Sequence, residues 1–133
     1  MAGGALACHT YLGAPDGLGG VAAPTTDGST ILVGGGIYGT NPQVPTTGKL
    51  FALNAANCGI KWSMPLPSPM RDYAALVPGL GLINVNNLTQ AFDINTGKAL
   101  WSYAGAAAYR NAPTVVPSGV YVEAASGDTY AFR

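Results

Sequence analysis

The order of apolar and polar positions predicts short β-strands along the chain. Apolar or alternating runs are separated by turn residues such as Pro78-Gly79, Asn86-Asn87 and Asn95-Thr96-Gly97, a pattern typical of strands. The predicted strands are Val21–Thr26, Thr30–Gly34, Lys49–Asn54, Ile60–Met64, Tyr73–Val77, Leu80–Val85, Leu88–Asp93, Lys98–Tyr103, Ala112–Val116, Val120–Ala124 and Asp128–Arg133. The predicted fold class is therefore all-β.

The strand pattern repeats along the chain with a period of 39 or 40 residues. A fixed spacing of this size is typical of stacked architectures in which every unit has the same set of strands. The residues that share it are Ala52, Ala91 and Ala131, Trp62 and Trp101, Arg71 and Arg110, and the pairs Val77-Pro78 and Val116-Pro117. Each unit is predicted to contain four strands.

The second unit carries a longer motif. Ala91, Asp93, Thr96, Gly97 and Trp101 form the pattern A-x-D-x-x-T-G-x-x-x-W. This pattern resembles the repeat signature of the pyrroloquinoline quinone (PQQ) β-propellers, the quinoprotein dehydrogenase type. The resemblance implies about three PQQ-like repeats, each a propeller blade of four antiparallel strands.

The motif residues suit the outer edge of a blade. An acid accepts backbone N–H groups across a turn, Thr-Gly permits a tight turn, and a Trp ring covers the seam to the next blade. The first unit keeps only Ala52 and Trp62 of the motif, and the third keeps Ala131. We therefore expect these two units to be degenerate copies with the same fold.

The resemblance implies a single PQQ-like propeller segment over residues 1–133. Residues 1–12 are expected to be the closing strand of a preceding blade, 13–64 blade one with a loop insertion at 35–47, 65–103 blade two, and 104–133 an incomplete blade three. Aligning Pro24 with Pro113 places Leu12 at the Trp position and Cys8 at the turn position of Cys58.

These expected ends are complementary. The first residues supply an outer strand, and the third blade lacks one. Three blades fall below the four to eight that normally close a ring, and an uncovered strand edge promotes aggregation. We expect either a segment of a longer propeller or head-to-tail association of copies. The predicted function is a structural or binding module that assembles by blade completion.

The alternative is a segment of a PQQ-dependent alcohol or sugar dehydrogenase. In that case Arg71 and Arg110 would hold a quinone carboxylate; otherwise they would bridge neighbouring loops or Asp72. The resemblance also implies a calcium ion held by oxygen ligands, but we expect Glu123, with Asn84 as its repeat equivalent, to form a surface or inter-blade hydrogen bond. No catalytic residue, metal ligand or cofactor is predicted for the isolated chain. PQQ and calcium are expected only if the chain is part of a complete propeller.

The amino-acid composition excludes some classes of function and favours a cellular location. Charged residues make up 9% of the chain and the net charge is zero, which argues against a nucleic-acid surface. No apolar run approaches the length of a membrane span. Low charge with many Gly and Thr residues favours an extracellular or periplasmic location, where Asn87-Leu88-Thr89 is a candidate glycosylation sequon.

The two cysteines are predicted to be unpaired or bonded to another chain. The repeat register puts Cys8 and Cys58 in the same turn of successive blades. Equivalent points on the outer rims of neighbouring blades should lie farther apart than the roughly 7 Å limit on the Cα separation of a disulfide.

Overall fold

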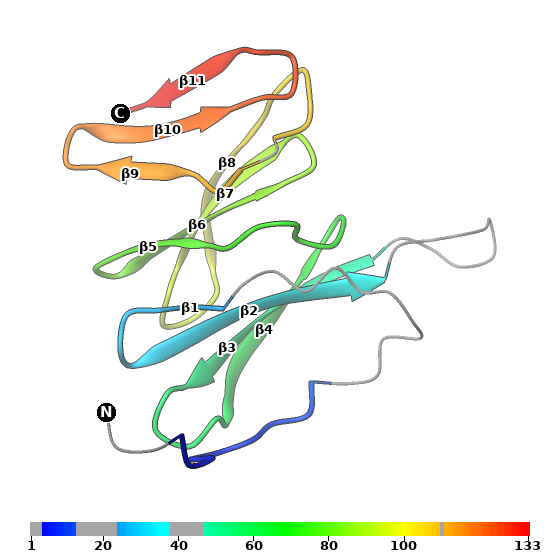
Figure 1. Ribbon diagram of the computed structural model, residues 1–133. Coiled ribbons are helices and arrows are strands. Elements are labelled where there is room, and N and C mark those ends of the chain that lie inside the picture. Colours follow the sequence, from blue (N-terminus) through cyan, green and yellow to red (C-terminus); the bar gives the residue numbers. More distant parts are fainter. Residues whose placement is uncertain (1–3, 13–23, 38–46, 110) are drawn as a thin grey trace.

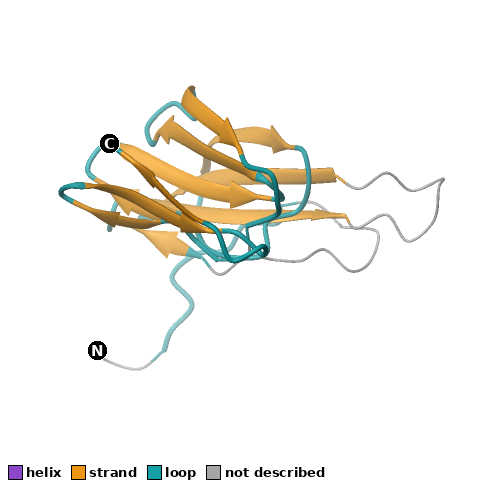
Figure 2. Ribbon diagram, turned by 90° about the horizontal axis from the view of Figure 1, so that it is seen from above, coloured by secondary structure: helices purple, strands orange, loops and turns teal. Residues whose placement is uncertain are grey.

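The computed structural model describes residues 4–12, 24–37, 47–109 and 111–133. Within these ranges the chain forms eleven strands in three antiparallel sheets, and the sheets follow one another in chain order (Figure 1). The view from above shows strands joined by loops, with no helix in the part described (Figure 2). The all-β prediction is confirmed. A membrane-crossing helix is likewise not found in these ranges.

Each sheet is a simple meander, and we name the sheets blades one, two and three. Blade one contains β1 (Thr25–Thr26), β2 (Thr30–Ile37), β3 (Thr47–Asn54) and β4 (Ile60–Leu66). Blade two contains β5 (Ala75–Val77), β6 (Leu80–Val85), β7 (Leu88–Asp93) and β8 (Ala99–Ala104). Blade three contains β9 (Thr114–Val116), β10 (Gly119–Glu123) and β11 (Thr129–Phe132).

The main hydrophobic core lies between blades one and two. Phe92 is fully buried there, and Gly81 on the neighbouring strand makes room for it, because a Cβ at Gly81 would lie 2.3 Å from the Phe92 ring. A smaller cluster of Tyr109, Val122 and Ala124 belongs to blade three. The buried residues of the main core are Leu32, Leu50, Ala52, Leu66, Met70, Ala74, Ile83, Val85 and Phe92.

The hairpin of blade one is longer than predicted. The loop was expected over residues 35–47, but β2 continues to Ile37 and β3 begins at Thr47, with Gly35 paired to Lys49. A Cβ at Gly48 would lie 1.9 Å from the carbonyl oxygen of Ser68. Glycine here permits close packing of another segment and does not mark a loop. Residues 38–46 lie outside the described residues.

The innermost strands of blades two and three are shorter than predicted, beginning at Ala75 and Thr114. Asp72 provides a physical reason. Its carboxylate accepts hydrogen bonds from the backbone N–H of Tyr73 at 2.8 Å and of Ala112 at 2.9 Å. Since these two amides bind a side chain, they are not available to a strand ladder.

Candidate functional site

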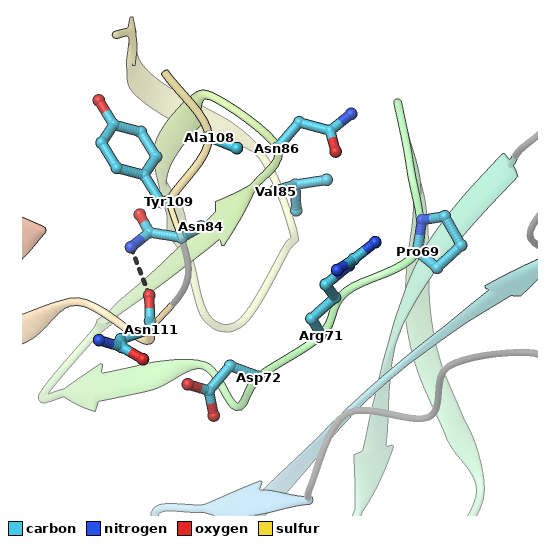
Figure 3. Close-up of a pocket in the computed structure, with 9 residues that line it drawn as sticks. All are labelled: Pro69, Arg71, Asp72, Asn84, Val85, Asn86, Ala108, Tyr109 and Asn111. Carbon is cyan, nitrogen blue, oxygen red and sulfur yellow. Dashed lines mark hydrogen bonds between the residues drawn. The ribbon is translucent and has the colours of Figure 1, made fainter. Parts of the chain in front are cut away.

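A cavity of about 400 Å³ lies where blades two and three meet. Its walls come from the segment that enters β5, the turn between β6 and β7, and the segment that enters β9 (Figure 3). The lining residues are Pro69, Arg71, Asp72, Asn84, Val85, Asn86, Ala108, Tyr109 and Asn111. Arg71, a predicted cofactor-binding residue, therefore lines a cavity. Its predicted companion Arg110 lies outside the described residues.

The polar side chains around this cavity hold the blades together. Asp72 bridges the approaches to β5 and β9 through its two backbone acceptors. Asn84 donates to the carbonyl oxygen of Asn111 at 2.7 Å and accepts from the Thr89 hydroxyl at 2.9 Å. These bonds use both carboxylate oxygens of Asp72 and both polar atoms of Asn84, so the two residues are positioned as connectors between loops.

Tyr109 forms one wall of the cavity but does not direct its hydroxyl at Arg71. In Figure 3 the hydroxyl points away from the Arg71 guanidinium. Burial raises the pKa of Tyr109 above its usual value, because a phenolate loses solvation in an apolar environment. Tyr109 consequently contributes a wall and no ready proton donor or acceptor to this space.

The calcium ligands that the resemblance implies do not come together in this structure. Asp72 and Asn84 are occupied by the hydrogen bonds given above, and Glu123 lines a separate hollow with Asn111 and Gly127. Among the described residues, no three His, Cys, Asp or Glu side chains gather at a potential metal site. The residues present therefore do not fit a calcium ion beside Arg71.

The repeat motif of blade two forms a tight turn after β7. The Asp93 carboxylate accepts from the backbone N–H of Asn95 and of Thr96, both at 2.9 Å, and from the Thr96 hydroxyl at 3.0 Å. The Thr96 N–H and then the Thr96 hydroxyl are the largest causes that lower the pKa of Asp93. Gly97 follows with a positive φ of 72°, and Cys58 has a φ of 57° at the equivalent place in blade one.

The two motif tryptophans lie across the seams between blades. Trp62 of β4 contacts Phe92 of blade two with ring centroids 5.6 Å apart, and its Nε1–H donates to the carbonyl oxygen of Ile94 at 2.9 Å. Trp101 of β8 contacts Phe132 of blade three at 5.2 Å. The outer strand of each of these blades thus packs on the third strand of the next.

The motif alanines are placed by the sheet register. Ala52 lies opposite Trp62, and Ala91 lies opposite Trp101. Both alanines are fully buried. A small side chain at this position allows the large ring opposite to lie against the neighbouring blade.

The prediction of unpaired cysteines is wrong. Cys8 and Cys58 form a disulfide with their Cα atoms 5.8 Å apart. The Thr10 hydroxyl also donates to the carbonyl oxygen of Cys58. The register argument failed because it placed Cys8 at a turn equivalent to that of Cys58, whereas Cys8 and Thr10 contact the Cys58 turn itself. The even number of cysteines in a chain of low charge was the available signal for the bond.

The candidate sequon at Asn87 is in the turn between β6 and β7. The Asn87 side-chain amide donates to the carbonyl oxygen of Gly105 at 2.8 Å, and Thr89 of the sequon is fully buried. Attachment of a glycan at Asn87 would have to change the bond to Gly105. Glycosylation at this site remains a prediction from the sequence.

The outer edges of the stack differ from its interior seams. No strand pairs with the outer edge of β11 within the part of the chain that the structure describes. At the other end of the stack, residues 4–12 lie against blade one without belonging to a sheet. Among the described residues, blade three therefore lacks the fourth strand that blades one and two have, and residues 4–12 belong to no sheet.

Comparison with solved structures gives the same fold. BamB from Moraxella catarrhalis superposes with a TM-score of 0.71 and 22% identity, and the match covers 95% of this chain and 36% of that chain. A europium-containing methanol dehydrogenase matches with a TM-score of 0.50 and 16% identity over 82% of this chain and 21% of that chain. The present chain thus spans about a third of BamB and less of the dehydrogenase.

A further match is the quinohemoprotein alcohol dehydrogenase ADHIIG from Pseudomonas putida HK5, with a TM-score of 0.48 and 16% identity over 77% of this chain and 19% of that chain. No protein-family model matches the chain, and no curated protein matches it. The three meander sheets in chain order and the overlap with BamB show that the chain has the fold of part of a PQQ-like β-propeller, with two four-stranded sheets and one three-stranded sheet among the described residues.

Proposed function

We propose that the chain is a structural or binding module that assembles by blade completion, with a second copy of itself or with further chain. The observation that carries this proposal is the state of the two ends of the stack. β11 has no partner on its outer edge among the described residues, and residues 4–12 lie beside blade one outside any sheet.

Physical chemistry favours completion of this edge. An exposed strand presents a row of unpaired N–H and C=O groups that can bind another strand. The exposed large apolar side chains include Tyr103 of β8, and its ring contacts Tyr130 and Phe132 of β11. A fourth strand on β11 would satisfy the backbone groups and cover part of this aromatic surface.

A dehydrogenase function is not proposed. PQQ and calcium are expected only in a complete propeller, and the described residues beside Arg71 do not form a calcium site. The likeness to dehydrogenases rests on the fold, and one fold carries many functions.

We also propose an extracellular or periplasmic location. The Cys8–Cys58 disulfide supports it, because such bonds persist mainly in oxidising compartments.

The mass of the 133-residue chain in solution tests the proposal. Self-assembly predicts a discrete oligomer whose mass decreases on dilution, and a variant that lacks residues 1–12 should lose that oligomer while retaining β-sheet circular dichroism. Completion by further chain predicts an isolated chain that aggregates through β11. A stable, monodisperse monomer at all concentrations would reject both versions.

A further inference from the structure

The turns that follow the third strands of blades one and two have the same backbone structure. In blade two, the N–H of Gly97 donates to the carbonyl oxygen of Asp93 at 2.8 Å. In blade one, the N–H of Cys58 donates to the carbonyl oxygen of Asn54 at 2.8 Å. Gly97 and Cys58 both have a positive φ, of 72° and 57°. The two turns are therefore equivalent positions of the repeat.

The turn of blade two is covered by a side chain from the outer strand of blade one. A Cβ at Gly97 would lie 2.7 Å from the Trp62 ring, so the indole packs directly on this turn. The Nε1–H of Trp62 also donates to the carbonyl oxygen of Ile94 at 2.9 Å. One side chain thus closes this seam with an aromatic contact and one hydrogen bond to the backbone of the turn.

The turn of blade one is covered by residues 8–10. Cys8 is bonded to Cys58, and the Thr10 hydroxyl donates to the carbonyl oxygen of Cys58. Cys8 and Thr10 are half-buried and His9 between them is exposed, because side chains alternate along an extended segment. Figure 1 shows the segment near the N-terminus passing beside the turn between β3 and β4. A disulfide and one hydrogen bond here take the place of the Trp62 contacts in blade two.

The two seams differ in the kind of bond that closes them. The contacts of Trp62 are packing and a hydrogen bond, and neither responds to a reductant. In blade one the closing bond is covalent and reducible. Without it, the hydrogen bond from Thr10 is the remaining polar contact of residues 4–12 in the part of the chain that the structure describes. One hydrogen bond stabilises less than the conformational entropy of ordering several residues costs.

We propose that the Cys8–Cys58 disulfide makes the seam at blade one redox-sensitive. When oxidised, the bond holds residues 8–10 on the turn at Cys58; when reduced by a dithiol, it releases them. The seam closed by Trp62 stays shut in both states. This inference concerns contacts within the described residues and is independent of the blade completion proposed above.

Release of residues 8–10 occurs by thiol–disulfide exchange. A thiolate of the dithiol attacks one sulfur of the Cys8–Cys58 bond, which breaks as a mixed disulfide forms. The second thiol of the reductant then attacks the mixed disulfide, and the reductant departs as a cyclic disulfide. The reductant loses two electrons and two protons, and Cys8 and Cys58 become thiols. An oxidising compartment therefore closes the seam and a reducing one opens it.

Limited proteolysis of the 133-residue chain with and without dithiothreitol tests the proposal, with a protease that has no disulfides of its own. Tyr11 is the reporter, because it lies next to Thr10 and is 69% exposed. Cleavage after Tyr11 should become about tenfold faster or more on reduction, since proteases cleave segments that have opened locally. Cleavage around Gly97 should stay slow in both states.

Two results of this experiment would overturn the proposal. Equal rates of cleavage after Tyr11 in the oxidised and reduced chains would show that residues 8–10 stay in place without the bond. Loss of the β-sheet circular dichroism on reduction, with cleavage inside β3 and β4, would show that the bond holds the blade itself and not only the seam.

A pair of double variants tests the equivalence of the two seams. Cys8→Trp with Cys58→Gly introduces the side chains found at the seam of blade two, and glycine accepts the positive φ of Cys58. Cys8→Ala with Cys58→Gly is the matched control, which differs only in lacking the indole. The tryptophan variant should resist cleavage after Tyr11 with or without dithiothreitol, and the alanine variant should be cleaved rapidly in both conditions.

The outcomes for the double variants separate the two parts of the proposal. Rapid cleavage of both variants would refute the equivalence with the Trp62 seam. Slow cleavage of the alanine variant would refute the role of the disulfide. If a double variant fails to fold, the comparison of the oxidised and reduced wild type decides the inference.

Discussion

At the scale of single residues, the turn before each outer strand determines how closely two blades approach. Gly97 has a positive φ, and a Cβ there would lie 2.7 Å from the Trp62 ring. The equivalent Cys58 has a side chain in the same backbone conformation, and that side chain is bonded to Cys8. The same position thus either admits an aromatic ring or forms a covalent link.

Replacement of Gly97 by alanine should destabilise the chain more than the same change at Gly79. Gly79 has a φ of 79° with no atom near the added Cβ, so Gly79→Ala should cost only the backbone strain of about 1 to 2 kcal/mol. Gly97→Ala should reduce the free energy of unfolding by about 1 to 3 kcal/mol more than Gly79→Ala does, because the added methyl group overpacks the seam at Trp62. Urea unfolding measures both. Equal losses would show that the close contact does not restrict this position.

The Asp93 turn should make stability depend on pH in the acid range. Its hydrogen bonds lower the pKa of Asp93 below the usual 3.8, so its contribution is complete above that pH. The contribution is lost as the pH falls through the lowered folded-state pKa. Asp93→Asn should therefore show a smaller loss of stability between neutral and acid pH than the wild type.

Urea midpoints across that pH range measure this effect. Asp27 is a second carboxylate whose pKa is lowered by turn hydrogen bonds. The largest cause is the backbone N–H of Thr30, and the next is the backbone N–H of Ser29. A variant with both residues changed to Asn should have the flattest profile. Identical profiles for the wild type and Asp93→Asn would contradict the role of the turn.

At the scale of elements, each outer strand stabilises the blade that follows it. Trp62 contacts the fully buried Phe92 and donates a hydrogen bond to Ile94. Trp101 contacts Phe132 on β11, a half-buried edge strand. The seam between blades one and two is therefore better packed than the seam between blades two and three.

Alanine at the two tryptophans should reveal this difference. Trp62→Ala should cost about 3 to 5 kcal/mol, the usual range for a large aromatic side chain in a core. Trp101→Ala should cost less in the monomer, because its partner ring is partly exposed. Denaturant unfolding at low protein concentration compares them. A larger loss for Trp101→Ala would contradict this ranking of the seams.

The sequence predicted the elements better than their contacts. The 39-residue period found the strand order because the blades repeat the same alternation, and blades one and two also repeat the turn after their third strands. It missed the Cys8–Cys58 bond, since the alignment of residues 1–12 depended on spacing across a segment with no shared motif. It also missed the role of Asp72, which joins loops 40 residues apart and has no local signature.

At the scale of the whole molecule, the stack of blades is open at both ends. Blade one is covered by a segment that belongs to no sheet, and blade three exposes the outer edge of β11 among the described residues. Residues 6–12 share the order of exposed and half-buried positions of the outer strand β4. We therefore expect β11 to gain order when blade three is completed, whether by a second copy or by further chain.

Amide hydrogen exchange of residues 6–12 and of β11 tests this account most directly. Backbone hydrogen bonds protect amides from exchange. Within the structure described, β11 lacks a partner on its outer edge and residues 6–12 have no partner strand. We predict slow exchange in both segments at high protein concentration, and faster exchange in both on dilution, while β7 stays protected throughout. Fast exchange of residues 6–12 at every concentration, with β7 still protected, would contradict blade completion between copies.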